Sequence, residues 1–241
     1  MAGDLASDLA ATQGTVPILV VRDPHLPFVV DRRTLFVACS YSGNTEETLS
    51  LFDQAARAQA SMLAIGSGGA LARKAADNSV PFITVDIATE PRCAVGYNLM
   101  LILGALRRVG ILKLEEQEAL GAVEALTRRV SALEENVPLA ENRAKQLAVA
   151  LHGKLIVIYG SGLFSGVARR WKTQINENAK AWAFYETLPE LLHNSVEAYP
   201  SRSNLADQTM TLLLQPALDE VGYGRHVTVV ADLLRRNNLA H

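Results

Sequence analysis

The sequence has few cysteines, almost no net charge and no long uninterrupted apolar run. Its 241 residues include two cysteines, Cys39 and Cys93, and its formal net charge at pH 7 is −2. Two cysteines cannot form a disulfide framework, so the simplest setting is a reducing cytoplasm. A net charge near zero gives no support for nucleic acid or an anionic membrane surface as a partner. Composition therefore argues against both of these partner classes.

The sequence also lacks the segments that direct a chain to or through a membrane. The early residues Asp4 and Asp8 are acidic, and no basic stretch followed by an apolar core opens the chain. The apolar run at 95–106 ends at Arg107 and Arg108, short of the roughly 18 residues of a membrane span. We therefore expect neither a signal peptide nor a membrane-spanning helix. The run at 95–106 is either a core helix or a helix at a subunit interface.

Metal-binding patterns are absent too. The internal histidines His25, His152 and His226 have no metal-ligand spacing to another histidine or cysteine. We expect no metal and no cofactor.

The sequence is rich in short apolar runs that alternate with helical patterns. Hydrophobic residues make up 49% of the chain, enough for one large or two small domains with a real core. The runs typical of buried parallel strands are 17–21, 34–39, 61–65, 81–85 and 154–159. Residues 44–60 and 70–77 have the pattern of crossover helices. This alternation predicts an α/β fold with parallel sheets and helices on both faces.

The chain is predicted to contain two such α/β domains. An amphipathic helix at 115–136 carries an apolar face and is followed by Pro138, and a shorter helix is expected at 141–152. A fresh strand and a small-residue turn then follow at 154–162, as they do at 34–48. We therefore expect a first domain at 1–112, a helical connector at 113–152 and a second domain at 153–241. The residues of the apolar face are Leu120, Val123, Leu126, Val130 and Leu133.

Residues 40–48 carry four serine or threonine hydroxyls, one glycine and one asparagine where a strand turns into a helix. Backbone N–H groups at a helix N-terminus are unpaired and partly positive, so this turn is suited to an anion. The segment has no lysine, so it is not a Walker A loop. It indicates a phosphate carried by a small molecule, whereas the structural alternative is an ordinary helix cap. The hydroxyls are those of Ser40, Ser42, Thr45 and Thr48.

The order Ser-Tyr-Ser-Gly-Asn-Thr-Glu-Glu-Thr resembles the phosphosugar-binding loop of sugar isomerase (SIS) domains. The resemblance implies two flavodoxin-like, three-layer αβα domains with parallel sheets. It also implies that Ser40, Ser42 and Thr45 bind the substrate phosphate.

A second polar constellation lies at 169–194. It places Glu177 among amides in a helical pattern, and His193 follows downstream. A carboxylate and a histidine are the groups that abstract and move protons next to a carbonyl. The structural alternatives are a solvated glutamate that pairs with Lys180 and a hydrogen-bonded histidine at a helix end.

Three motifs together resemble the bacterial and archaeal bifunctional phosphoglucose/phosphomannose isomerases. They lie at 20–27, at 90–97 and at 171–194, where Trp-Lys-Thr-Gln-Ile-Asn-Glu-Asn-Ala-Lys precedes Pro-Glu-Leu-Leu-His-Asn. The resemblance places the general base on Glu177, the ring-opening histidine on His193 and the enediolate-stabilising arginine on Arg92. In that family the histidine comes from the partner subunit, so a homodimer with a shared active site is implied. The implied reaction is aldose–ketose isomerisation of hexose 6-phosphates through a cis-enediolate, without a metal.

The chain departs from the family pattern at both ends. It begins with Met-Ala-Gly-Asp, without the first strand and its Gly-Gly-Ser turn, and it ends before a lysine-bearing C-terminal helix. We expect weak or no turnover from these 241 residues. The competing hypothesis is a non-catalytic SIS protein that binds a phosphosugar. A dinucleotide-binding oxidoreductase is disfavoured, because Gly160 and Gly162 do not fit the G-x-G-x-x-G spacing through Gly166 and no strand-end acid follows.

Overall fold

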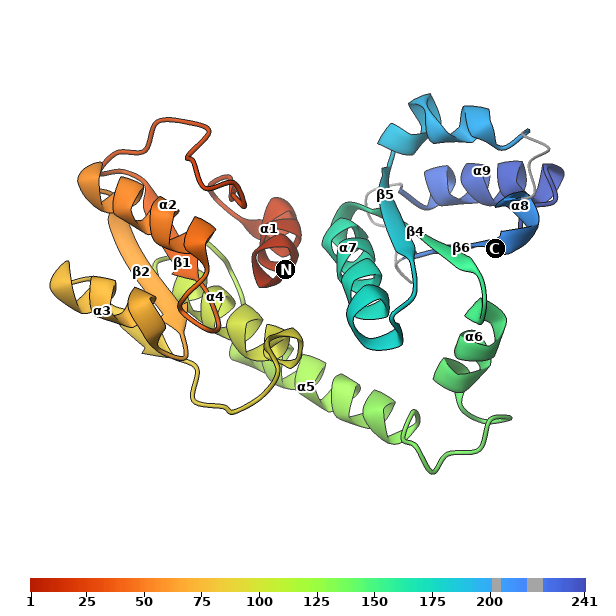
Figure 1. Cartoon of the computed structure of the whole chain (residues 1–241), viewed down its shortest axis with the longest axis horizontal. Coiled ribbons are helices and arrows are strands. Elements are labelled where there is room, and N and C mark those ends of the chain that lie inside the picture. Colours follow the sequence, from red (N-terminus) through yellow and green to blue (C-terminus); the bar gives the residue numbers. More distant parts are fainter. Residues whose placement is uncertain (201–204, 216–222) are drawn as a thin grey trace. The chain divides into compact units, whose positions relative to one another are not determined.

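The computed structural model of the chain describes residues 1–200, 205–215 and 223–241. The chain divides into two units, Met1–Lys113 and Leu114–His241. Each unit contains a three-stranded sheet in which every neighbouring pair of strands is parallel (Figure 1). The predicted α/β class with parallel sheets is confirmed. The domain boundaries at 112 and 152 stay a prediction.

The sheet of unit 1 has the strand order β1-β2-β3. Its strands are β1 (Leu35–Cys39), β2 (Ser61–Gly66) and β3 (Phe82–Thr84). The crossover helices are α2 (Glu46–Arg57) and α3 (Gly69–Asp77), close to the predicted positions. Small strand residues allow these helices to pack closely on the sheet. The buried cluster between them consists of Ala38, Phe52, Ala64, Leu71 and Ala75.

Helices α1 (Ala2–Gln13) and α4 (Val95–Arg108) pack against each other in unit 1. The buried face of α1 is made of alanines spaced four apart, and α4 buries Asn98, Ile102, Leu103 and Leu106. Small residues let the two helices approach closely. The apolar run at 95–106 is therefore a core helix on this face, while its opposite face leaves Tyr97 and Met100 exposed.

The predicted strand at 17–21 is wrong. This segment has no regular secondary structure, and the side chain of Leu19 is 65% exposed. The Ile18 carbonyl accepts a hydrogen bond from the Ser7 hydroxyl at 3.0 Å, so it bonds to α1 and not to a sheet. An apolar run forms a strand only where a neighbouring strand can pair with it, and the sequence of the run alone does not show whether such a partner exists.

The sheet of unit 2 has the strand order β5-β4-β6. Its strands are β4 (Leu155–Ser161), β5 (Ala183–Leu188) and β6 (Thr209–Leu213). Helix α7 (Ser165–Gln174) contacts β4 and β5, after the short turn η2 (Gly162–Phe164). Helix α9 (Tyr223–Arg236) packs in a second cluster that includes Tyr159, Leu188, Val230 and Leu234. The short helix α8 (Leu205–Gln208) precedes β6.

Helices α5 (Glu116–Ser131) and α6 (Arg143–Leu151) precede β4. The sequence predicted a helix to residue 136, but α5 ends five residues earlier, and Asn142 then caps α6 by accepting the Lys145 N–H at 3.1 Å. The predicted apolar face of α5 is exposed, with side chains between 50% and 65% accessible at Leu120, Val123, Leu126 and Val130. None of the helices in the described part of the chain has both the length and the apolar character of a membrane crossing.

Candidate functional site

Three loops of unit 1 follow the carboxyl ends of its strands. They are residues 40–45 after β1, 67–68 after β2 and 85–90 after β3. Because the strands are parallel, all three loops emerge at the same edge of the sheet. This edge is where open α/β sheets bind ligands.

The hydroxyl-rich loop at 40–45 ends at the N-terminus of α2. Ser40 is 5% exposed, and its Oγ lies 2.8 Å from the Thr45 Oγ1. Ser42 is exposed, and its Oγ accepts the Asn44 N–H at 3.3 Å. Thr45 occupies the N-cap position but makes no side-chain capping bond to α2. The Thr45 side chain therefore does not cap the first-turn N–H groups of α2, and the role of this loop in phosphate binding stays a prediction.

Glycine allows this loop to pack directly against the next one. Gly43 has φ +66°, and a Cβ there would lie 1.9 Å from the Gly68 carbonyl oxygen. A Cβ on Gly69 would lie 2.5 Å from the Ser42 carbonyl oxygen. The Asn44 Oδ1 also accepts the Ala70 N–H at 3.0 Å. The two loops thus form one backbone-to-backbone unit, which sequence reasoning did not identify.

Arg92 lies directly after the third loop at the same edge. It belongs to the short turn η1 (Pro91–Cys93), and its Nη1 lies 3.3 Å from a Glu90 carboxylate oxygen. Tyr41 joins this loop to the hydroxyl-rich loop, because its hydroxyl bonds to Ile87 and Thr89. The structure therefore places Arg92 directly after a loop that is bonded to the loop of Ser40, Ser42 and Thr45.

Glu177 lies in unit 2, on the π-helical turn η3 (Ile175–Ala179) that follows α7. Its side chain is exposed. Lys180, at φ +55°, donates from Nζ to the Glu177 carbonyl at 2.5 Å, so the Lys180 contact is to the backbone and not to the carboxylate. Single π-turns inside or at the end of α-helices are frequent at functional sites.

His193 lies on η4 (Glu190–His193), which follows β5, and its side chain is exposed. Glu177 precedes β5 and His193 follows it, so the two residues lie at opposite ends of that strand. A strand rises about 3.3 Å per residue, which makes the six residues of β5 about 20 Å long. Within unit 2 the structure does not bring the predicted base and the predicted histidine together.

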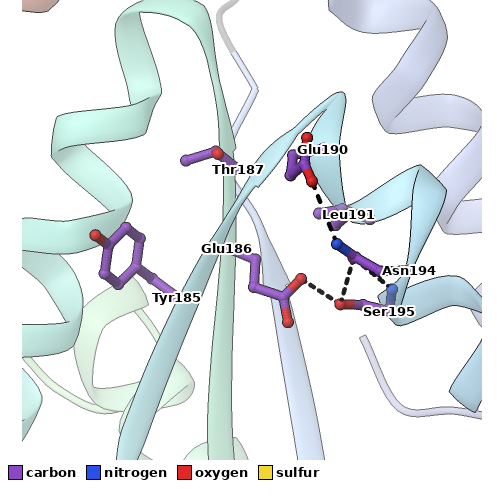
Figure 2. A pocket seen from close by; sticks show the side chains of 7 residues that line it. All are labelled: Tyr185, Glu186, Thr187, Glu190, Leu191, Asn194 and Ser195. Carbon is purple, nitrogen blue, oxygen red and sulfur yellow. Dashed lines mark hydrogen bonds between the residues drawn. The ribbon is translucent and has the colours of Figure 1, made fainter.

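A pocket of about 420 Å³ adjoins the His193 turn (Figure 2). The Glu186 carboxylate, on β5, accepts a hydrogen bond from the Ser195 hydroxyl, and the Ser195 hydroxyl also lies 3.0 Å from the Asn194 Oδ1. These bonds fasten the η4–η5 turn to the sheet, where η5 is Ser195–Ala198. The pocket is lined by Tyr185, Glu186, Thr187, Glu190, Leu191, Asn194 and Ser195.

Tyr159 and Tyr199 belong to a buried cluster that also contains Leu191 of this turn. The Tyr199 hydroxyl donates to the Tyr159 hydroxyl at 3.2 Å. Burial is the main cause that raises the pKa of both tyrosines above the ordinary value, and the nearby Glu186 charge raises it further. Both tyrosines therefore stay neutral at physiological pH.

The described residues contain neither a cluster of metal ligands nor a disulfide. Across 1–200, 205–215 and 223–241, no group of three His, Cys, Asp or Glu side chains is arranged to hold a metal ion. Cys39 and Cys93 are free thiols, and burial raises the pKa of Cys39.

Known structures share this fold at low sequence identity. The C-terminal domain of glucosamine-fructose-6-phosphate aminotransferase from Francisella tularensis aligns with a TM-score of 0.70 at 16% identity, over 98% of this chain and 66% of that one. Tagatose-6-phosphate ketose/aldose isomerase from Escherichia coli aligns with a TM-score of 0.54 at 20% identity, over 86% of this chain and 55% of that one. At these identities the likeness establishes the fold alone.

Sequence comparison is more specific. Residues 140–240 match the bacterial phospho-glucose isomerase C-terminal SIS domain. The bifunctional phosphoglucose/phosphomannose isomerase of Caldicellulosiruptor bescii is 32% identical over 97% of this chain and 69% of its own length. The enzyme of the same name from Thermoplasma acidophilum is 38% identical over 80% of this chain, which spans 57% of its length. The chain therefore belongs to the bifunctional phosphoglucose/phosphomannose isomerase family.

Proposed function

We propose that this chain carries out aldose–ketose isomerisation of hexose 6-phosphates, converting glucose 6-phosphate or mannose 6-phosphate to fructose 6-phosphate. The observation that supports this most directly is the hydroxyl-lined N-terminus of α2, held beside the Arg92 loop at the carboxyl edge of the unit 1 sheet. Family membership supplies the reaction class.

Substrate binding is assigned to the loop at 40–45. Ser40, Ser42 and Thr45 hold the phosphate with their hydroxyls, assisted by the first-turn N–H groups of α2. The interaction is favourable without a lysine because the helix N-terminus is itself partly positive.

Proton transfer is assigned to Glu177. In the open-chain aldose, Glu177 removes the C2 proton and returns it to C1, while a proton passes from the C2 hydroxyl to O1. Arg92 stabilises the negative charge that develops on the cis-enediolate. The hydrogen lost at C2 is restored at C1, so no oxidant, reductant or cofactor is consumed. The planar enediolate has no stereochemistry at C2, so one site accepts glucose and mannose 6-phosphates.

Ring opening is assigned to His193 of a second copy of the chain. Its exposed side chain follows β5, whereas Glu177 precedes β5, so one copy of unit 2 presents them at opposite sheet edges. A homodimer with a shared site resolves this separation by pairing Glu177 of one subunit with His193 of the other. We also place the protein in a reducing cytoplasm, which suits its free thiols.

The decisive test follows the C2 proton of glucose 6-phosphate by NMR in D₂O, with and without the protein. Exchange of that proton at a rate proportional to protein concentration is the expected result. Saturable binding of the sugar phosphate without any exchange would instead identify a non-catalytic phosphosugar-binding protein. The same measurement decides whether these 241 residues are weak or fully active.

A further inference from the structure

The Tyr41 side chain bridges two loops that are far apart in the sequence. Its hydroxyl donates to the Ile87 carbonyl at 2.5 Å and accepts the Thr89 N–H at 3.0 Å. The phenol hydroxyl thus donates one hydrogen bond and accepts another, both with backbone groups of one short segment. That segment lies between β3 and η1, where no regular secondary structure fixes the chain.

The Tyr41 backbone contacts a third loop. Its carbonyl accepts the Ser67 N–H at 2.8 Å and the Ser67 hydroxyl at 2.6 Å. Tyr41 therefore connects the loops that follow β1, β2 and β3, which are the three loops at the carboxyl edge of the unit 1 sheet.

We propose that Tyr41 is a positioning residue, which holds the loop of Arg92 at a fixed place relative to the phosphate-binding loop. This inference rests on the proposed isomerase function. The substrate phosphate is at C6 and the enediolate charge develops at O1 and O2, so the two binding groups must be separated by a set distance. An error of about 1 Å in such placement can reduce turnover by about 10²-fold.

The hydroxyl is the part of Tyr41 that matters. Without it the Ile87 carbonyl and the Thr89 N–H lose their partner, and the segment before Arg92 is no longer fastened. The hydroxyls and helix N–H groups that bind phosphate are untouched by this loss. The effect should therefore fall on catalysis and on the mobility of the 86–93 segment, and not on phosphate affinity.

The test compares Tyr41→Phe with the matched control Tyr97→Phe, whose ring is 53% exposed on α4. Tyr41→Phe should lower kcat by about tenfold or more. It should leave the Kd for inorganic phosphate within about twofold of wild type, because it removes no phosphate ligand. Tyr97→Phe should change neither quantity. In an Arg92→Ala background, Tyr41→Phe should lower kcat little further, since coupled residues are not additive.

Hydrogen–deuterium exchange supplies a readout that is independent of turnover. Amides in segment 86–93 should exchange faster in Tyr41→Phe than in wild type or Tyr97→Phe. If the wild-type chain shows no C2-proton exchange, these 241 residues do not turn over the substrate. The amide exchange and the phosphate affinity then still decide the positioning role. Unchanged exchange in 86–93 would overturn the inference. So would a loss of phosphate affinity parallel to kcat, or a full additional loss in the Arg92→Ala background.

Discussion

At the scale of single residues, Glu177 combines an exposed carboxylate with a fixed backbone. Its carbonyl accepts the Lys180 Nζ, and the neighbouring Asn178 Nδ2 donates to the Gln174 Oε1 at 2.9 Å. The turn is thus held by contacts that do not involve the carboxylate. A change confined to that carboxylate should leave folding intact and report on chemistry alone.

Glu177→Gln should abolish exchange of the substrate C2 proton. The amide keeps the shape of the side chain but cannot accept the proton, and loss of a general base typically costs about 10²–10⁴-fold. The free energy of unfolding should stay close to wild type, because the side chain is exposed. NMR in D₂O and urea unfolding measure the two effects. Glu141→Gln, at another exposed site, is the control, and wild-type exchange in Glu177→Gln would remove Glu177 from its role.

The double variant Ser42→Ala/Thr45→Ala should weaken binding of inorganic phosphate by about 1–3 kcal/mol, through loss of one or two charge-assisted hydrogen bonds. Isothermal titration calorimetry measures the change. The matched control is Thr127→Ala/Ser131→Ala on α5, whose hydroxyls donate only to carbonyls of their own helix. Equal phosphate affinity in the first variant and in wild type would place the phosphate site elsewhere.

At the residue scale, the sequence could predict which hydroxyls lie together where their positions are encoded locally, while their role in binding phosphate stays a prediction. The hydroxyls of Ser40, Ser42 and Thr45 share one turn, so their clustering at the start of α2 was visible in the sequence. The Tyr41 hydroxyl bonds to residues 46 and 48 positions away, and no local pattern specifies such partners. The bond between Glu186 and Ser195 joins β5 to a turn that follows the strand, and it equally lacks a local sequence signature.

At the scale of elements, the sequence predicted the strands β1, β2, β3 and β4 but did not predict β5 and β6. The run at 34–39 became β1, but the run at 17–21 became irregular chain that bonds to α1. The helix predicted to reach residue 136 ended at Ser131, and Asn142 started the next one. Apolar periodicity thus overestimated the length of α5, and the Asn142 cap marks where α6 begins.

Gly43→Ala should disturb the paired loops after β1 and β2. The native φ of +66° costs a residue with a side chain about 1–2 kcal/mol, and the new Cβ would also overlap the Gly68 carbonyl. Both the free energy of unfolding and the affinity for inorganic phosphate should fall. Urea unfolding and calorimetry measure these losses.

The control for this prediction is Gly121→Ala on α5, where an added Cβ meets nothing within 4 Å. There the change should be neutral or stabilising by up to about 1 kcal/mol, since alanine favours a helix over glycine. A Gly43→Ala variant that matches wild type in both stability and phosphate affinity would show that the two loops need not pack backbone to backbone.

At the scale of the whole molecule, strand direction decides which residues can meet. The sequence suggested that Glu177 and His193 belong to one site, because only 16 positions separate them in a segment with a helical pattern. The structure inserts β5 between them and sends them to opposite sheet edges. Sequence periodicity carries no information on this separation, which follows from the parallel crossover connection. We propose that a site shared between two copies of the chain brings them together.

Two defective chains should therefore restore each other. Glu177→Gln supplies an intact His193, and His193→Ala supplies an intact Glu177, so each mixed dimer contains one complete site. Random pairing of equal amounts in a two-fold dimer should return about one quarter of wild-type turnover of ring-closed glucose 6-phosphate. Each variant alone should show little turnover of that substrate. Co-expression of the two chains with separable tags, followed by a coupled assay, measures the recovery.

The control mixes Glu177→Gln with a chain carrying both substitutions, because no pairing of those two chains contains a complete site. Recovery in that mixture would trace the activity to contamination. Absence of recovery in the first mixture, with mixed dimers verified by their tags, would assign Glu177 and His193 to sites within single chains. Light scattering provides an independent check, because a shared site requires a mass of about twice 26.1 kDa at micromolar protein. A mass of one chain under turnover conditions would contradict the shared site directly.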